Sequence, residues 1–314
     1  METIKKHIIL GAGGAIGLPL AKELVKNNQK VKLVSRKQHN EPNTESAVAD
    51  LNIIQQVKDT IEENSIVYLL AGLQYNLKIW QGQWPIIMRN TIEACKSKNA
   101  KLIFFDNVYM YGKVNGKMDE KTPINPCSKK GEVRAKIAEY LLSEIKQKNI
   151  TALIARSADF YGPYASHSSI PGLMVFANQI KGKKAQWIIN ADVKHSYTYT
   201  MDCSKSLYLL SKEESAFNQV WHLPTASPAL TGKQFIELSA KIFQVQPAFS
   251  VYSKLMLKLG GFFDKTVKEL YEMIYQTEFD YEFDSSKFEK HFKFKPTSYE
   301  AGINETLKFL RESN

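Results

Sequence analysis

The chain has 314 residues, of which 44% are hydrophobic and 24% are charged, a balance that is ordinary for a globular protein with a large core. No stretch approaches the roughly 18 uninterrupted apolar residues that a membrane-spanning helix needs, which excludes an integral membrane protein of that kind. The first predicted strand begins close to Met1 and leaves no room for a signal peptide, so we expect a cytoplasmic protein without a membrane partner.

The net charge of +10 raises the question of nucleic-acid binding. The lysines are scattered, and a run such as Lys181–Lys184 is short and has no interleaved aromatic residues on which bases could stack. We therefore expect no nucleic-acid partner, and we attribute part of the charge to an anionic ligand. The three cysteines (Cys95, Cys127 and Cys203) match neither a disulfide framework nor a zinc site, so no metal is expected.

Short β-rich runs alternate with amphipathic helical stretches through the first half of the chain. The expected strands are His7–Leu10, Lys30–Ser35, Ile66–Leu70, Lys101–Phe105 and Ile150–Arg156, and the expected helices are Leu18–Asn27, Ile53–Glu62, Ile87–Lys98 and Arg134–Lys148. This alternation is typical of βαβ units and predicts an α/β fold, a Rossmann-type doubly wound parallel sheet. We assign residues 1–162 to this dinucleotide-binding domain.

Beyond Gly162 the alternation ends. A helix near Leu173–Lys181, a strand at Ala185–Ile189 and helices at Thr231–Phe243, Ser253–Leu259 and Thr266–Gln276 are expected there. Residues 163–314 are thus predicted to form a smaller, mostly helical substrate-binding lobe. The two parts are expected to be interleaved, with residues around 190–225 returning to the first domain.

A glycine-rich segment follows the first strand and leads into a predicted helix. It comprises Gly11, Ala12, Gly13, Gly14, Ala15, Ile16 and Gly17. In this context Gly11 permits a tight turn, Gly14 lets the backbone approach a pyrophosphate, and Gly17 allows the helix to pack closely on the strand. The helix N-terminus then favours the negative charge of the pyrophosphate. The alternative is a glycine-rich loop without a ligand.

The end of the second strand indicates which dinucleotide binds. An NAD site usually carries Asp or Glu there to accept a hydrogen bond from the ribose 2′-hydroxyl. This chain has Ser35, Arg36 and Lys37, which can hold a 2′-phosphate, and Arg36 can also stack on adenine. The sequence therefore favours NADP over NAD, unless these cations are merely solvated.

Further segments make the chain similar to the extended short-chain dehydrogenase/reductase family of NAD(P)-dependent epimerases and dehydratases. They are Phe104–Gly112, Arg156–Pro163, His195–Asp202, Asp284–Lys287 and Phe294–Thr297. The resemblance implies that Asp50 and Leu51 contact adenine and that Ala71, Gly72 and Asn107 adjoin the cofactor. It also implies a substrate site that includes Ser157, Asp159, Phe160, Tyr161, His195 and Tyr197.

The chain departs from this family in its catalytic helix. Family members carry a Ser or Thr followed by a Tyr-x-x-x-Lys pair, and the aligned positions here hold Asn107, Gly131 and Ala135. Tyr109 and Tyr111 are the substitute acids available at the strand exit, and Asn107 can donate a hydrogen bond. Nearby cations, Lys130 and Arg134 among them, are expected on the surface, although their place at a helix start hints at an anionic partner.

Two functions follow from these residues and this resemblance. The first is an NADP-dependent oxidoreductase, epimerase or dehydratase that acts on a hydroxyl- or carbonyl-bearing substrate, with a nucleotide-linked substrate as one option. The second is a non-catalytic NADP-binding protein that senses redox state or acts as a scaffold. Either function is compatible with a homodimer, which the sequence leaves undecided.

Overall fold

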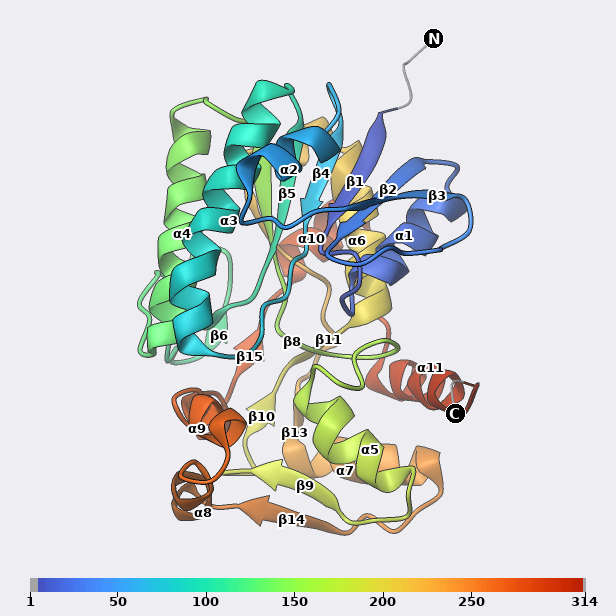
Figure 1. Ribbon diagram of the computed structural model, residues 1–314. Coiled ribbons are helices and arrows are strands. Elements are labelled where there is room, and N and C mark those ends of the chain that lie inside the picture. Colours follow the sequence, from blue (N-terminus) through green and yellow to red (C-terminus); the bar gives the residue numbers. More distant parts are fainter. Residues whose placement is uncertain (1–4, 313–314) are drawn as a thin grey trace. The chain divides into compact units, whose positions relative to one another are not determined.

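The computed structural model describes residues 5–312 and contains a seven-stranded sheet (Figure 1). The strand order is β12-β7-β5-β4-β1-β2-β3, with β1 at Lys6–Leu10, β2 at Lys30–Ser35, β3 at Thr44–Val48, β4 at Ile66–Leu69, β5 at Lys101–Asp106, β7 at Ala152–Arg156 and β12 at Val220–His222. The pairings from β3 to β7 are all parallel. The strand order reverses between β1 and β4, and ligands of doubly wound sheets bind at the carboxyl ends of the strands around such a point.

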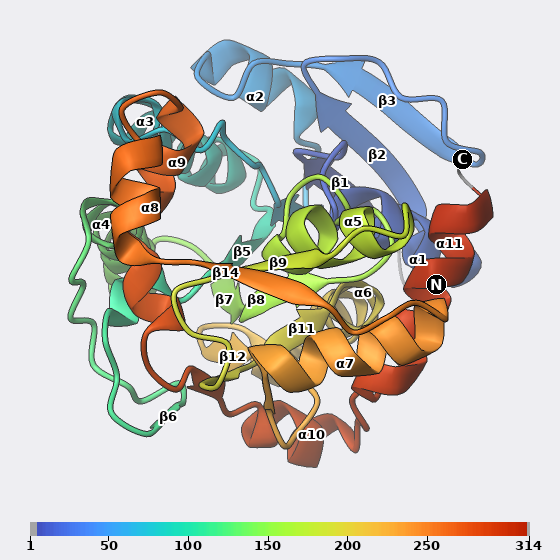
Figure 2. The same ribbon diagram turned by 90° about the horizontal axis from the view of Figure 1, so that it is seen from below.

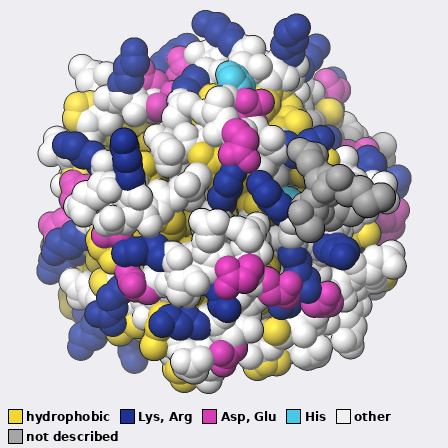
Figure 3. Space-filling view, turned by 90° about the horizontal axis from the view of Figure 1, so that it is seen from above, with side chains coloured by type: hydrophobic (Ala, Val, Ile, Leu, Met, Phe, Trp, Pro, Cys, Tyr) yellow, Lys and Arg dark blue, Asp and Glu magenta, His cyan; other side chains and the backbone are white. Residues whose placement is uncertain are grey.

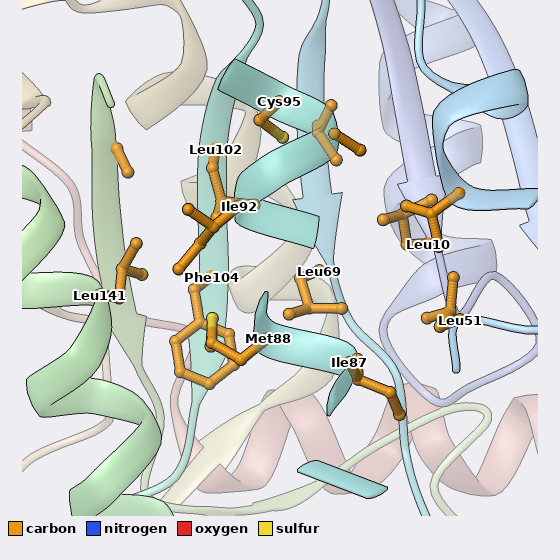
Figure 4. Packing of buried hydrophobic residues seen from close by; sticks show 14 of the residues in the cluster. Leu10, Leu51, Leu69, Ile87, Met88, Ile92, Cys95, Leu102, Phe104 and Leu141 are labelled. Atoms are coloured by element: carbon orange, nitrogen blue, oxygen red, sulfur yellow. The ribbon is translucent and has the colours of Figure 1, made fainter. Parts of the chain in front are cut away.

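Helices cover both faces of this sheet, which explains why the central strands consist of buried residues. They are α1 (Gly17–Lys26), α2 (Ile54–Thr60), α3 (Leu77–Ser97), α4 (Lys129–Lys146) and α6 (Thr200–Lys212). Every residue of β4 and of β7 is buried. Figure 4 shows Met88 and Ile92 of α3 beside Phe104 and Leu102 of β5, within the main hydrophobic cluster.

The predicted Rossmann-type fold is confirmed, and the five predicted strands agree with the structure to within two residues. The predicted helix at Ile87–Lys98 was too short, because α3 begins at Leu77 and contains Gly82 and Pro85. The side chain of Asn76 caps this helix by accepting a hydrogen bond from the Ile79 N–H, and the burial of Trp80 and Trp84 stabilises the early turns. Tertiary packing thus outweighs two residues of poor helix propensity.

The chain divides into two compact units and passes between them repeatedly. Unit 1 comprises residues 5–110, 130–156 and 203–221, and unit 2 comprises residues 111–129, 157–202 and 222–312. Unit 1 contains the central sheet except for the last residue of β12. The chain thus first leaves the dinucleotide-binding unit at Tyr111, well before Gly162.

Unit 2 combines helices with short paired strands (Figure 2). The strand pairs are β6 (Lys117–Met118) with β15 (Glu282–Phe283), β8 (Asp159–Tyr161) with β11 (Tyr197–Tyr199), β9 (Ala185–Ile188) with β14 (Phe249–Tyr252), and β10 (Lys194–His195) with β13 (Leu230–Thr231). The helices are α5 (Ala177–Gln179), α7 (Gly232–Phe243), α8 (Lys254–Gly260), α9 (Lys265–Tyr271), α10 (Ser286–Phe292) and α11 (Tyr299–Glu312). Its core is largely aromatic, with Tyr161, Trp187, Tyr197, Phe235 and Tyr299 among the buried members.

Two helix predictions in unit 2 need correction. The helix expected near Leu173–Lys181 is a π-helical turn, Pro171–Phe176, that continues into the short α5. The helix expected at Thr266–Gln276 stops at Tyr271, and a 3₁₀ turn, Ile274–Thr277, follows it. Within residues 5–312, no helix is both long enough and apolar enough to cross a bilayer.

Candidate dinucleotide-binding site

The glycine-rich turn lies between β1 and α1 in unit 1, and two of its glycines are required by the fold. Gly11 has a φ of +91°, and a side chain there would stand 2.5 Å from the Ala71 Cα. A side chain on Gly17 would collide with the backbone of Ala12, so only glycine lets α1 approach the turn this closely. These two positions explain the shape of the turn without reference to a ligand.

Gly14 differs from them, because the protein itself leaves space beside it. A Cβ at this position would have the Gly11 carbonyl oxygen as its nearest neighbour, at 3.7 Å. No side chain caps the adjacent N-terminus of α1, whose N-cap residue is Ile16. An open backbone next to an uncapped helix N-terminus fits a pyrophosphate. The residues present therefore fit the dinucleotide that the sequence predicts.

The carboxyl end of β2 presents cations and no carboxylate. Arg36 and Lys37 are exposed, and the Ser35 hydroxyl donates a hydrogen bond to the Lys37 carbonyl oxygen at 2.7 Å. The Ser35 hydroxyl also lies 2.9 Å from Nε2 of His39. The ring of His39 in turn adjoins Gly13, since a Cβ on that glycine would be 3.2 Å from its Cε1. His39 was not predicted from the sequence, because only the folded loop brings it beside the turn.

The other predicted cofactor residues of unit 1 have these surroundings. The Asp50 carboxylate accepts hydrogen bonds from the N–H of Asn52 at 2.9 Å and from its side chain at 2.8 Å. These bonds, and secondarily the charge of Arg36, lower the pKa of Asp50. The Leu51 carbonyl oxygen accepts from the side chain of Asn90, Ala71 packs beside Gly11, and Gly72 has open space around its Cα.

Asn107 and Tyr109 follow β5 directly. The side-chain oxygen of Asn107 accepts a hydrogen bond from the Tyr109 N–H at 3.1 Å, which leaves the amide nitrogen of Asn107 as a donor. The ring of Tyr109 stacks on that of Trp80, with centroids 6.2 Å apart and an interplanar angle of 11°. Both side chains therefore have defined positions at the end of the strand.

Lys130 and Arg134 are buried, and the expectation that they are surface charges was wrong. Their exposed fractions are 0% and 3%. Arg134 donates from both Nε and Nη2 to one oxygen of Asp106, the last residue of β5, and its guanidinium lies over the Trp84 ring. The Lys130 ammonium is 4.6 Å from the ring centroid of Tyr75. For Arg134, the anionic partner suggested by the sequence is thus Asp106, a residue of the same unit.

Arg156, at the end of β7, extends this ionic cluster. Its Nε lies 3.8 Å from the second carboxylate oxygen of Asp106, and both side chains are buried. Gly131 and Ala135, which we predicted to take the places of the family's Tyr and Lys, are buried, adjoin Lys130 and Arg134 in the sequence, and carry no reactive group. The α4 helix thus carries two buried cations, Lys130 and Arg134, beside these two positions.

Tyr111 belongs to unit 2 and is 1% exposed. Its hydroxyl lies 2.9 Å from Nε2 of His222, and Nδ1 of that ring lies 2.9 Å from the carbonyl oxygen of Asp284. The ring of His222 also stacks on Phe283. This arrangement gives Tyr111 a packing role within unit 2, so that Tyr109 is the better of the two candidate acids.

The predicted substrate residues meet in unit 2 because β8 and β11 pair in parallel. Nε2 of His195 lies 3.0 Å from Asp159, and its ring is stacked between Tyr197 and Tyr281. Asp159 and Phe160 are the half-buried members of the predicted set. The others are buried, with Ser157 bonded to the Ala158 carbonyl oxygen and Tyr161 within the aromatic core.

Charged side chains elsewhere give no continuous basic surface on the face seen in Figure 3, where Lys and Arg are interspersed with Asp and Glu. This distribution agrees with the expectation of scattered lysines.

A doubly wound sheet with a glycine-rich turn at its switch point defines a dinucleotide-binding protein of the Rossmann class. Residues 7–221 match the model of the NAD dependent epimerase/dehydratase family. This match covers more than half of the chain, which therefore belongs to that family. The comparison with curated proteins gave no match.

Solved structures of similar fold include three bacterial enzymes. A dTDP-glucose 4,6-dehydratase from Bacillus anthracis, in complex with NAD, has a TM-score of 0.80 at 15% identity and covers 98% of this chain and 97% of its own. A UDP-glucose 4-epimerase from Thermotoga maritima, with UDP-glucose, has a TM-score of 0.77 at 17% identity, covering 98% and 99%. A UDP-glucuronic acid 4-epimerase from Bacillus cereus, in complex with NAD, has the same TM-score, identity and two coverages. At 15–17% sequence identity, the similarity to these three structures establishes the fold of this chain and nothing further.

Proposed function

We propose that this protein is an NADP-dependent oxidoreductase, epimerase or dehydratase that acts on a hydroxyl- or carbonyl-bearing, nucleotide-linked substrate. The observation that carries the proposal is the turn itself, in which Gly14 and the uncapped start of α1 leave space for a pyrophosphate. Family membership supports the reaction class. The substrates named for the similar structures, such as UDP-glucose, support a nucleotide sugar.

The preference for NADP rests on the side chains around the end of β2. Arg36 and Lys37 supply two positive charges, and Ser35 and His39 add polar groups beside Gly13. The 2′-phosphate distinguishes NADP from NAD, and cations and hydrogen-bond donors recognise phosphate. The similar structures that are complexed with a dinucleotide contain NAD, so the cofactor preference is a point on which this chain is proposed to differ from them.

Arg36→Asp tests this preference. We expect the parent protein to bind NADP(H) more tightly than NAD(H), and the variant to lose about ten- to a hundredfold in NADP affinity, because a charge-assisted hydrogen bond is replaced by repulsion. Titration of both dinucleotides against intrinsic fluorescence measures the gap. Lys136→Asp, at an exposed position of α4, is the matched charge control and should leave both affinities unchanged. Equal affinities in the parent protein would contradict the NADP proposal.

In catalysis the bound cofactor would accept or donate a hydride, and the chain must supply the proton transfer. Asn107 would donate from its amide nitrogen to the substrate oxygen that changes between hydroxyl and carbonyl. Tyr109, held against Trp80, is the phenol nearest in sequence to this amide, and we propose it as the general acid or base. In the opposite direction of the reaction, Tyr109 in its deprotonated, phenolate form would take the proton from the substrate hydroxyl.

Tyr109→Phe and Asn107→Ala test this assignment. Loss of a general acid should lower turnover by about 10²–10⁴-fold, whereas NADP affinity should change little in either variant. Turnover is measured as NADPH oxidation with a panel of carbonyl and nucleotide-sugar substrates. Tyr111→Phe is the control, because its hydroxyl bonds to His222 within unit 2. A Tyr109→Phe variant with full turnover would exclude Tyr109 as the acid.

A second candidate function, non-catalytic NADP sensing, has its own supporting observation. The catalytic positions of α4 hold Gly131 and Ala135, while the neighbouring Arg134 is packed among Asp106, Trp80 and Trp84. A sensor should bind NADP and NADPH with different affinities and turn over no member of the panel, because a ligand shifts an equilibrium only through differential affinity. Turnover of any panel member that depends on Asn107 would favour the enzyme.

A further inference from the structure

The helical pair α8 and α9 of unit 2 carries an unusual concentration of exposed apolar side chains. Figures 1 and 2 both show these two helices side by side. Phe262 and Phe263 in the turn between them are 77% and 93% exposed. Together with Leu255, Met256 and Leu259 of α8, all more than half exposed, they form what we call the apolar tip. Single exposed apolar residues are ordinary on a protein surface, but a group of five on one short segment indicates a binding surface.

The apolar tip is held in place by the other side of the same helices. Leu257 is buried in a small cluster with Ile188 and Ile274, against which Val267 and Leu270 of α9 also pack. The turn is bonded through its backbone, since the N–H groups of Phe263 and Asp264 both donate to the Gly260 carbonyl oxygen. Asp264 then caps α9. The two phenylalanines therefore project from an anchored turn, and the hydrophobic cluster is complete without them.

The charges of this segment are mostly positive. Residues 254–271, which span α8 and α9, contain Lys254, Lys258, Lys265 and Lys268 against the carboxylates of Asp264 and Glu269, a net charge of +2, and all four lysines are exposed. Lys254 also pairs with Glu278. Long lysine side chains can lie along an apolar surface while their ammonium groups reach anionic groups above it.

We propose that the apolar tip inserts into the interface of an anionic phospholipid membrane, with the surrounding lysines on the headgroup phosphates. A cationic rim around an apolar centre complements the two layers of such an interface, and aromatic residues are favoured at this depth. The site is a turn between two short helices, and a fluid interface accepts such a protrusion without matching its shape. The proposal is independent of the proposed function, and it differs from the expectation of no membrane partner, which considered only spanning segments.

Vesicle co-sedimentation of the full chain tests the proposal. We expect binding to vesicles of phosphatidylcholine with phosphatidylglycerol, and much weaker binding to phosphatidylcholine alone. Phe262→Ser/Phe263→Ser should lower the partition coefficient on anionic vesicles by about tenfold or more. Lys258→Glu/Lys265→Glu should weaken binding and reduce its sensitivity to salt between about 0.1 and 1 M, where surface charges become screened.

The control is Val48→Ser/Leu173→Ser, which removes two other exposed apolar side chains and should bind as the parent does. Dinucleotide affinity, measured on every variant, verifies that the fold is intact. Failure of the parent to bind anionic vesicles would overturn the proposal, and so would equal binding by the phenylalanine variant. Concentration-dependent dimerisation that the phenylalanine variant abolishes, without vesicle binding, would also overturn it and assign the tip to a second copy of the chain.

Discussion

Gly11, Gly14 and Gly17 are one residue type used for different purposes within a single turn. Gly11 needs its positive φ, and Gly17 needs the space that a side chain would take from Ala12. Gly14 has neither requirement, because its nearest potential contact is at ordinary van der Waals distance. The position therefore offers a way to disturb the ligand site without disturbing the fold.

Gly14→Val should abolish the binding of both NADP and NAD while the free energy of unfolding changes little. The valine side chain would occupy the space through which a pyrophosphate approaches the backbone. Fluorescence titration and denaturant unfolding measure the two properties. Gly82→Ala, at another glycine with open space around it, is the matched control and should retain binding. Intact dinucleotide binding by Gly14→Val would show that the pyrophosphate does not lie beside this residue.

Among elements, α4 differs most from what its sequence suggests. Lys130 and Arg134 are one helical turn apart, and the packing of α4 on β5 directs Arg134 at Asp106 rather than at solvent. A buried ion pair of this kind is costly to break from one side, because Asp106 would stay buried with the more distant Arg156, 3.8 Å from its other oxygen, left as a charged partner.

Arg134→Leu should therefore lower the free energy of unfolding by about 3–5 kcal/mol. Asp106→Leu should cost at least as much, since it takes the carboxylate away from both Arg134 and Arg156, and the double variant Arg134→Leu/Asp106→Leu should recover part of the Asp106→Leu loss because one of the two buried cations is removed as well. Denaturant unfolding of the parent, the two single variants and the double variant measures the coupling. Lys136→Leu, on the exposed side of the same helix, should change stability little. An unaltered stability of Arg134→Leu, combined with weaker NADP binding, would instead assign Arg134 to ligand binding.

At the scale of the whole molecule, stability depends on pH through groups that burial keeps neutral. His7 on β1 is 3% exposed, and its Nδ1 lies 2.8 Å from the Tyr68 hydroxyl on β4. Burial lowers its pKa from 6.5 to about 4. The imidazole of His7 takes up a proton more readily in the unfolded chain than in the folded protein. The stability that neutral His7 contributes is therefore fully present above pH 6.5 and is lost as the pH falls toward 4.

We expect the His7 contribution to fall by about 2 kcal/mol between pH 7.5 and pH 5. Gln at position 7 cannot titrate but can still bond to Tyr68. The free energy of unfolding of His7→Gln should therefore fall by about 2 kcal/mol less than that of the parent between the same two pH values. Thermal or denaturant unfolding of both proteins at the two pH values measures the difference. Parallel losses in the two proteins would show that other groups cause the acid sensitivity.

The sequence by itself determined the features that depend on neighbouring residues. Apolar β-rich runs that alternate with amphipathic helical stretches predicted the parallel sheet, because strands that are buried on both faces are continuously apolar. The spacing of Gly11, Gly14 and Gly17 predicted the turn, since backbone sterics act over a few bonds. That no Tyr-x-x-x-Lys pair can be built on the α4 helix likewise followed from residue types alone, because its single tyrosine, Tyr140, is followed four residues later by Glu144.

Only the tertiary structure decided which distant residues meet. It places His39 beside Gly13, packs Arg134 against Asp106, joins Tyr111 to His222, and brings Asp159 to His195 by pairing β8 with β11. Each of these contacts depends on the path of the chain between its members, which no local pattern encodes. A charged residue on a helix can face solvent or the core, and the choice follows from the neighbour that the fold supplies.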